Sequence, residues 1–189
     1  MAFLQSLAII CLTIMAAIVY GIVHDQITAR ICVEYFTIGH PPVFPTDDPT
    51  LLAFGWGVIA TWWVGLILGV LLAVAAQAGP WPPMGVGQLF RPLAFTLFII
   101  GGIAAAAGVV GHFAATRVWV ELVGPIADRV PADRHFAFLT DLWTHLASYI
   151  GGAVCGAGLC IRVLIWRKHA ASQMVAPPAD RQGINVLAT

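Results

Sequence analysis

The sequence predicts an all-α membrane protein in which four transmembrane helices form one bundle. Of its 189 residues, 60% are hydrophobic and only 10% are charged, whereas a soluble domain carries roughly 25% charged residues. Four apolar stretches are each long enough to cross a hydrocarbon core, which takes about 20 helical residues. None shows the period-two alternation of membrane strands. The expected spans cover residues 3–23, 51–78, 93–116 and 139–166.

The first apolar stretch is expected to remain in the protein as a helix. The residues ahead of its apolar run include no Lys or Arg, and the run is longer than the core of a typical signal peptide. No small-x-small cleavage site precedes His24. These features argue against a cleaved leader and favour a retained first span.

Positive charge after the fourth span predicts the orientation. The cluster Arg167-Lys168-His169 follows that span, and such clusters stay in the cytoplasm. With four spans, both termini are then cytoplasmic and the connections 24–50 and 117–138 face outward. We therefore expect a multi-pass protein of a bacterial inner membrane, with a transmembrane domain over 1–169. Residues 170–189 are small, polar and proline-containing, which predicts a disordered cytoplasmic tail.

Charge and small residues restrict the expected partners. The net charge is zero, so no basic field indicates nucleic-acid binding. The inner halves of the spans hold almost no polar groups, which argues against a transport path. Gly65-x3-Gly69 and Gly152-x3-Gly156 form small-residue ridges that allow close helix packing. Besides the lipid bilayer, the expected partner is another membrane protein or a second copy, bound through these glycine-rich faces.

Histidines and carboxylates gather where the spans are expected to reach the outer leaflet. Ionisable groups at this depth are costly and mark functional sites by default. At 1.5 Å per residue, His112 and His145 lie about 6–7 Å below the outer ends of their spans, and His24 closes the first span. Imidazoles and carboxylates from several helices build metal sites in bundles. The predicted ligands are His24, Asp25, Glu34, His112 and His145.

The expected cofactor is a transition metal ion, with zinc, iron or copper left open. No HExxH or CxxC spacing selects among them. Asp141 lies four residues before His145, on the same helix face. Asp25 and Asp141 are candidate hydrogen-bond acceptors for the ligating histidines. The candidate cofactor- or substrate-binding residues are Tyr20, Arg117 and Tyr149.

The outer connection adds two residues whose role the sequence leaves open. His40 can fold back over the bundle or remain in solvent. Cys32 is the only cysteine expected outside the membrane, so an intrachain disulfide there is not expected. It is either a buried, inert thiol or a thiolate ligand or redox thiol beside Glu34.

Three stretches carry a resemblance. Tyr20-Gly-Ile-Val-His-Asp-Gln-Ile continues to Glu34-Tyr-Phe-Thr, and the chain also contains Trp62-Trp63-x-Gly65-Leu66 and His145-x2-Ser148-Tyr149-x-Gly151-Gly152. Together they resemble a group of small bacterial four-span membrane proteins without an established activity, which share a Tyr-Gly-Ile-x-(His/Asn)-Asp-Gln-Ile run. The resemblance covers about half the chain. It implies the four-span fold and directs attention to the outer face, and it implies no reaction.

Two functions are compatible with these patterns. The first is a metal-dependent membrane enzyme or metal-handling protein with its site at the outer, periplasmic leaflet. The alternative is a non-catalytic accessory subunit, or an anchor for a haem or pigment in a larger complex. The sequence leaves open whether the protein is an enzyme.

Overall fold

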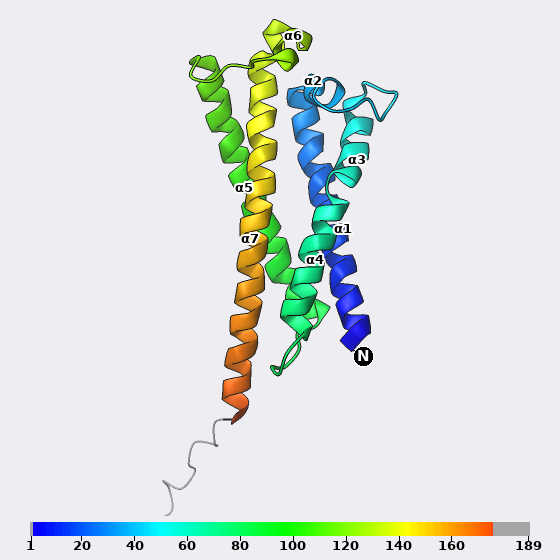
Figure 1. The fold of residues 1–189 in the computed structure, drawn as a ribbon, viewed down its shortest axis with the longest axis vertical. Helices are drawn as coiled ribbons and strands as arrows, with labels where there is room; N and C mark the ends of the chain where they lie inside the picture. The colour runs from blue at the N-terminus through cyan, green and yellow to red at the C-terminus, as the bar shows by residue number, and fades with distance from the viewer. Residues whose placement is uncertain (1, 176–189) are drawn as a thin grey trace, which may run out of the picture.

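The computed structural model describes residues 2–175, and these confirm the predicted all-α bundle (Figure 1). No strand occurs within the described residues. Four segments are long and apolar enough to cross a membrane, so the chain is a multi-pass membrane protein. The helices are α1 (Ala2–Ile31), α2 (Val33–Thr37), α3 (Pro49–Ile59), α4 (Trp62–Gln77), α5 (Val86–Thr116), α6 (Pro125–Arg129) and α7 (His135–Val175), with a 3₁₀ turn at Ala132–Arg134.

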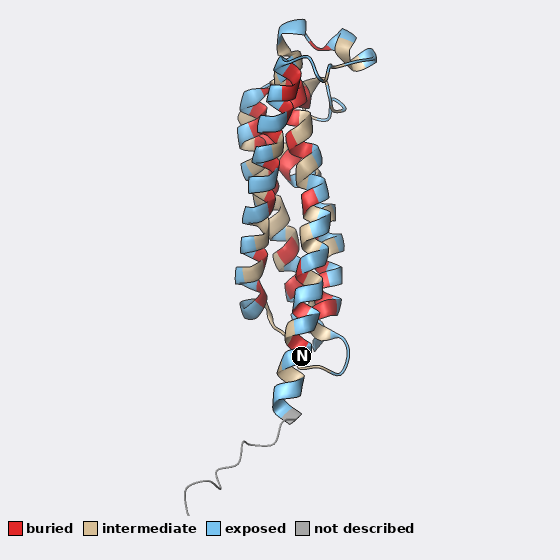
Figure 2. Ribbon diagram, turned by 90° about the vertical axis from the view of Figure 1, so that its left-hand side faces the viewer, coloured by how far each residue is buried: buried red, intermediate tan, exposed pale blue. Residues whose placement is uncertain are grey.

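The bundle consists of two pairs of helices. One pair is α1 against α3 and α4, which together form a single interrupted span, and the other is α5 against α7 (Figure 1). Helix α4 also contacts α7 and joins the pairs. Buried residues line the inward faces, and exposed residues cover the outside (Figure 2). We call the end that carries α2 and α6 the α2 end, and the opposite end the N-terminal end.

The helices extend beyond the predicted spans. Helix α1 continues to Ile31, so His24 and Asp25 lie inside a helix and not in a connection. Helix α7 runs from His135 to Val175, which corrects the prediction that the disordered tail begins at residue 170. The remainder of that predicted tail, 176–189, lies outside the described residues.

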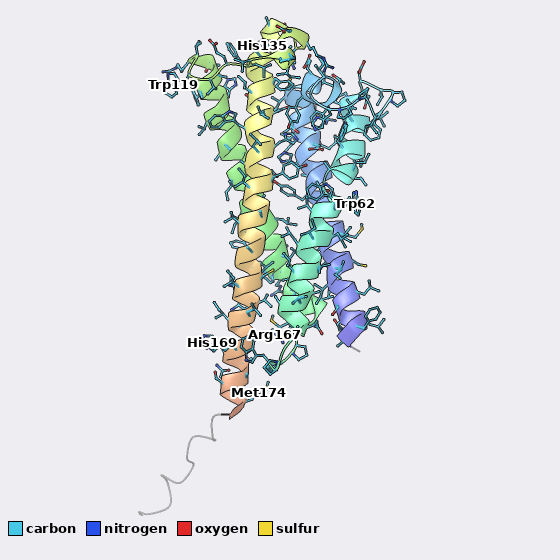
Figure 3. The ribbon with its side chains drawn as sticks, in the orientation of Figure 1. Trp62, Trp119, His135, Arg167, His169 and Met174 are labelled. Carbon is cyan, nitrogen blue, oxygen red and sulfur yellow. The ribbon has the colours of Figure 1, made fainter. Side chains whose placement is uncertain are left out.

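Arg167 belongs to the bundle, although the sequence places it in the positive cluster after the fourth span. Its side chain is buried and donates hydrogen bonds to three backbone carbonyls. The acceptors are Pro82 at 2.9 Å, Trp81 at 2.8 Å and Ala75 near the end of α4. Figure 3 shows Arg167 beside the connection between α4 and α5, at the N-terminal end. The guanidinium thus satisfies the Ala75 carbonyl, which the C-terminus of α4 leaves without a helical partner, and two carbonyls of the connection that follows.

Glycines bring α1 into close contact with α3 and α4. A Cβ atom on Gly57 would lie 2.6 Å from the backbone N and Cα of Ile22, and one on Gly65 would lie 2.7 Å from the Cα of Ile14. Only a residue without a side chain allows this approach. The predicted Gly65 ridge is therefore used inside the bundle. Gly152 and Gly158 on α7 have open space beside them.

Gly57→Ala is expected to destabilise the protein by about 2 kcal/mol, because the new methyl group overlaps the α1 backbone. Gly102→Ala is the matched control, since a Cβ there meets nothing within 4 Å. The control is expected to be neutral or slightly stabilising because alanine favours helix. Thermal unfolding of both variants in one detergent checks this. Equal changes in unfolding temperature for the two variants would show that the α1–α3 contact is looser than described.

Candidate metal centre

Three potential metal ligands meet between α1 and α7, near the α2 end. His24 and Asp25 come from α1 and His145 from α7. One ligand atom from each residue lies within 4.8 Å of the other two. Nε2 of His145 is 3.3 Å from Oδ1 of Asp25. Asp25 and His145 are buried and His24 is half-buried.

A reversal of the chain after α1 covers this cluster. Cys32 adopts an extended conformation (φ −147°, ψ 96°) that ends α1, and the chain then folds back as α2. The reversal places Tyr35 against His145, with the ring centroids 4.4 Å apart in a stacked arrangement. Phe36 contacts the same imidazole edge-on at 5.7 Å. These rings restrict the rotation of His145 and exclude solvent from it.

The hydrogen bonds of His145 define which of its nitrogens faces the cluster. Nδ1 lies 2.8 Å from the backbone carbonyl of Asp141. A carbonyl can only accept, so Nδ1 carries the hydrogen. In the neutral imidazole, Nε2 then presents its lone pair to Asp25. A ligating histidine usually donates its second nitrogen in this manner. The predicted pairing with Asp141 thus occurs through its backbone carbonyl.

Buried polar atoms beside the cluster lack partners. Within the described residues, Nε2 of His24 and both carboxylate oxygens of Asp141 are buried without a hydrogen bond. Buried polar side chains are almost always satisfied, and an orphaned one calls for a specific explanation. Asp141 is fully buried. The unsatisfied groups carry lone pairs or negative charge, which is what a cation would complement.

A small cavity of about 60 Å³ adjoins the cluster. A single water needs roughly 10–15 Å³, so an ion with a bound water fits. Its wall is formed by three of the four spans, which are α1, the interrupted span of α3 and α4, and α7. Helix α2 and the connection that follows it complete the wall. The lining includes Tyr20, His24, Asp25, Tyr35, His40, Thr61, His145, Ser148 and Tyr149. The structure therefore places two of the predicted binding residues, Tyr20 and Tyr149, on the cavity wall.

The second span is interrupted at the depth of this cavity. Helix α3 ends at Ile59 and α4 begins at Trp62. The Ala60 carbonyl, left free by the break, accepts a hydrogen bond from the Tyr149 hydroxyl at 3.3 Å. The Thr61 hydroxyl donates to the Gly57 carbonyl. Irregular backbone at membrane depth is tolerated where it is buried in protein or lines a cavity, and this break does both.

The structure does not bring Glu34, His112 and Arg117 into the cluster. Helix α5 packs on α7 through a buried face that contains Gly108 and Gly111. His112 follows Gly111, about 100° further round the helix, and is exposed with its Nδ1 3.2 Å from Oγ1 of Thr140. Arg117 is exposed at the C-terminus of α5. The prediction for His112 relied on its depth in the span, and the rotation of α5 turns it away from the centre. Arg117 was a candidate for binding a substrate or cofactor, and it does not line the cavity beside the cluster.

Glu34 forms an ion pair instead. Its Oε2 accepts a hydrogen bond from Nε of Arg134 at 3.0 Å, and Arg134 also donates to the Ile31 carbonyl at 2.9 Å. The thiol of Cys32 donates to the same carboxylate at 3.3 Å. Burial, and then the hydrogen bond to Glu34, raise the pKa of Cys32 to about 12. Cys32 is thus a protonated, buried thiol, which agrees with the first of its two predicted roles, that of a buried and inert residue.

The ion pair gives a pH-dependent stability. Burial favours the neutral acid, but hydrogen bonds from its own backbone amide, Arg134 and Cys32 outweigh burial and lower the pKa of Glu34 below its ordinary 4.5. Its contribution to the free energy of unfolding is therefore complete above pH 4.5. That contribution is lost as the pH falls from 4.5 through the lowered pKa.

We expect Glu34→Gln to abolish this acid-dependent loss, so that wild type and variant converge in stability as the pH falls. Thermal unfolding in detergent between pH 7 and pH 3 checks it, expressed as the difference between the two proteins at each pH. A difference that stays constant with pH would contradict the ion pair.

His40 is a cavity residue absent from the predicted ligand set. Its Nδ1 donates to the Tyr35 carbonyl at 2.8 Å, and its ring lies against Trp56 at 4.5 Å between centroids. Burial lowers the pKa of His40, so the neutral form is favoured. The connection after α2 folds back over the bundle, which was one of the two alternatives that the sequence left open, and this brings His40 to the cavity. Tyr35 had a signal only in the Glu-Tyr-Phe-Thr resemblance, and Trp56 and Thr61 had none.

The cluster supplies two imidazoles and one carboxylate. Catalytic zinc sites use three such protein ligands and keep a fourth position open, and non-haem iron centres use two histidines with one carboxylate. The group can therefore bind a metal ion. No protein-family model, curated protein or solved structure matches this chain.

Proposed function

We propose that the protein is a membrane metalloprotein that binds one divalent transition-metal ion through His24, Asp25 and His145. The observation that carries the proposal is the convergence of these three ligand atoms within 4.8 Å, with Nε2 of His24 buried and unsatisfied. Zinc and ferrous iron suit this donor set best. Glu34 and His112, ligands in the sequence-based prediction, have no part in it.

The spacing supports a small ion. Ligands about 2.0–2.1 Å from a tetrahedral ion lie about 3.3–3.4 Å from one another. The 3.3 Å between Nε2 of His145 and Oδ1 of Asp25 matches that edge. It is also long for a hydrogen bond to a charged group, for which 2.7–2.9 Å is usual.

Charge balance supports a divalent ion. Asp25 and Asp141 are both buried within the bundle, and two uncompensated carboxylates there would be costly. An ion of charge +2 bound by Asp25 compensates that carboxylate and leaves a net positive charge near Asp141. Asp25 contacts the ion, and Asp141 lies one turn before His145 on α7.

An ion held by three ligands retains a position for water or substrate. Bound metal lowers the pKa of its water and polarises carbonyl or phosphoryl oxygens. In the cavity beside the ligands, the hydroxyl oxygens of Tyr149 and Thr61, whose hydrogens are donated to backbone carbonyls, can accept a hydrogen bond from a reacting molecule. We propose a metal-dependent membrane enzyme, with this centre toward the periplasmic face of a bacterial inner membrane.

Metal content tests the proposal. Protein purified in mild detergent without chelator is expected to retain about one equivalent of zinc or iron, measured by elemental analysis. His24→Ala with His145→Ala is expected to lose it. The matched control is His112→Ala with His135→Ala, two histidines outside the cluster, which is expected to retain the metal.

Equal metal content in the two double variants would overturn the proposal. A folded wild-type protein that binds neither zinc nor iron on titration would do the same, and the contact between Asp25 and His145 would then be a hydrogen-bonded pair. Metal-free protein that copurifies with another membrane protein would favour the accessory-subunit alternative.

A further inference from the structure

An apolar groove runs between α1 and α5 on the side of the bundle. It consists of two hollows of about 630 and 700 Å³ that share Tyr20, Val23, Ile27 and Gly101 in their walls. Helices α1 and α5 belong to different helix pairs (Figure 1). Small residues of α5, among them Ala105 and Gly108, leave the space open.

The groove has the length and surroundings of a lipid chain. Along α1 it extends from Leu12 to Ile31, about 28 Å at 1.5 Å per residue, against about 30 Å for a hydrocarbon core. Both walls are membrane-crossing helices, so the mouth faces bilayer hydrocarbon. Its rim includes Phe98, of which 79% is exposed. The groove thus continues the lipid-facing surface into the protein.

The α2 end of the groove carries polar groups. The single hydroxyl hydrogen of Thr140 is donated to the Phe136 carbonyl at 2.8 Å. His112 must therefore donate its Nδ1 hydrogen to Oγ1 of Thr140, which leaves Nε2 as an acceptor. His112 lines the groove. A hydroxyl or ammonium group of a bound molecule can donate to this nitrogen, whereas an ester oxygen, which only accepts, cannot.

Two residues connect the groove to the metal centre. Tyr20 and His24 line both the groove and the cavity beside the cluster, with their ring centroids 5.6 Å apart. The Tyr20 hydroxyl forms a 2.8 Å hydrogen bond with Ser148. A molecule in the groove therefore lies against one of the proposed ligands, and only side chains separate it from the cavity.

We propose that the substrate of this centre is a bilayer phospholipid, with one acyl chain in the groove between α1 and α5, its ester region beside His24, and a hydroxyl or ammonium group of its headgroup at His112. The role of this lipid as a substrate rests on the proposed metal function. A water-soluble substrate is disfavoured because the groove walls are apolar over nearly their whole length. The lipid reaches the centre sideways from the membrane.

Photolabelling tests whether a phospholipid occupies the groove. The protein is reconstituted in vesicles of phosphatidylethanolamine and phosphatidylglycerol, with a tracer phosphatidylethanolamine that carries a diazirine in one acyl chain. Ala105→Trp fills the groove. Ala106→Trp is the matched control, because Ala106 is also exposed and lines neither hollow of the groove. Labelling of Val23 and Val109 is expected in wild type and control and is lost in Ala105→Trp, while labelling of Val154 on α7 stays constant.

A second readout links the groove to the centre. In cobalt-substituted protein, transfer from detergent to these vesicles is expected to shift the visible spectrum in wild type and Ala106→Trp but not in Ala105→Trp. Identical labelling or identical spectra in the two tryptophan variants would overturn the inference and leave the metal proposal standing. Groove labelling in a wild type that binds no metal would remove the metal proposal, and the substrate role with it.

Discussion

Asp25→Asn is expected to lower the affinity for metal by about 100-fold or more, whereas Glu34→Gln is expected to leave it unchanged. Both changes remove one negative charge near the α2 end. Only the Asp25 carboxylate lies in the cluster, 3.3 Å from Nε2 of His145. Even residues that merely orient metal ligands alter affinity 10–100-fold. Glu34 is held by Arg134 and Cys32.

In the absence of metal, the order is reversed, and Asp25→Asn is expected to be more stable than Glu34→Gln. Asp25→Asn replaces a buried carboxylate with a neutral amide, which removes a desolvation cost and offsets the altered contact with His145. Glu34→Gln loses a partly exposed ion pair, worth about 1 kcal/mol or less. Competition with a chelator measures affinity, and thermal unfolding of the chelated proteins measures stability. Similar metal affinities for the two variants would show that Asp25 is no ligand.

The fold was predictable because the membrane imposes a single strong constraint. Each span must satisfy its backbone internally over about 20 residues, and the apolar runs have that length. Helix ends were less predictable, because helices continue into the interface. Helix α1 runs eight residues beyond the expected end of its span, from 23 to Ile31, which is why His24 and Asp25 are helical.

The sequence predicted how deep the residues of the candidate site lie, but not which way their side chains face. His24, Asp25 and His145 were expected near one level, and they do meet. His112 shares that level but faces the groove, because the rotation of α5 depends on which residues pack against α7. A Cβ on Gly111 would lie 2.6 Å from the Trp143 ring. Such contacts are tertiary and leave no periodic signal in a sequence this uniformly apolar.

The end of α5, predicted at residue 116 from the apolar run and observed at Thr116, lacks the usual local stop signal. Val118 has a positive φ of 56° and follows the C-terminus of α5. Its amide donates to the Ala115 carbonyl at 3.0 Å, and that of Trp119 to Ala114 at 2.9 Å. This is the pattern of a Schellman motif, which normally has glycine at the left-handed position. A valine there gives no indication that the helix ends.

The role of Arg167 was equally hidden, and its replacement is expected to have the largest effect on stability. Arg167→Met should destabilise the protein by about 3 kcal/mol, because carbonyls that now accept from a charged donor lose their partners. The three acceptors lie at the end of α4 and in the connection that follows it. Methionine retains most of the apolar stem, so the loss reports on hydrogen bonds more than on packing.

Lys168→Met is the matched control, since Lys168 is adjacent and exposed and its loss should cost little. Arg167→Lys should recover only part of the stability, because a single ammonium group cannot reproduce the forked geometry of guanidinium. Thermal unfolding in one detergent ranks the four proteins as wild type, Lys168→Met, Arg167→Lys and Arg167→Met, from most to least stable. If Arg167→Met unfolds at the same temperature as Lys168→Met, the buried guanidinium does not hold the α4–α5 connection to α7.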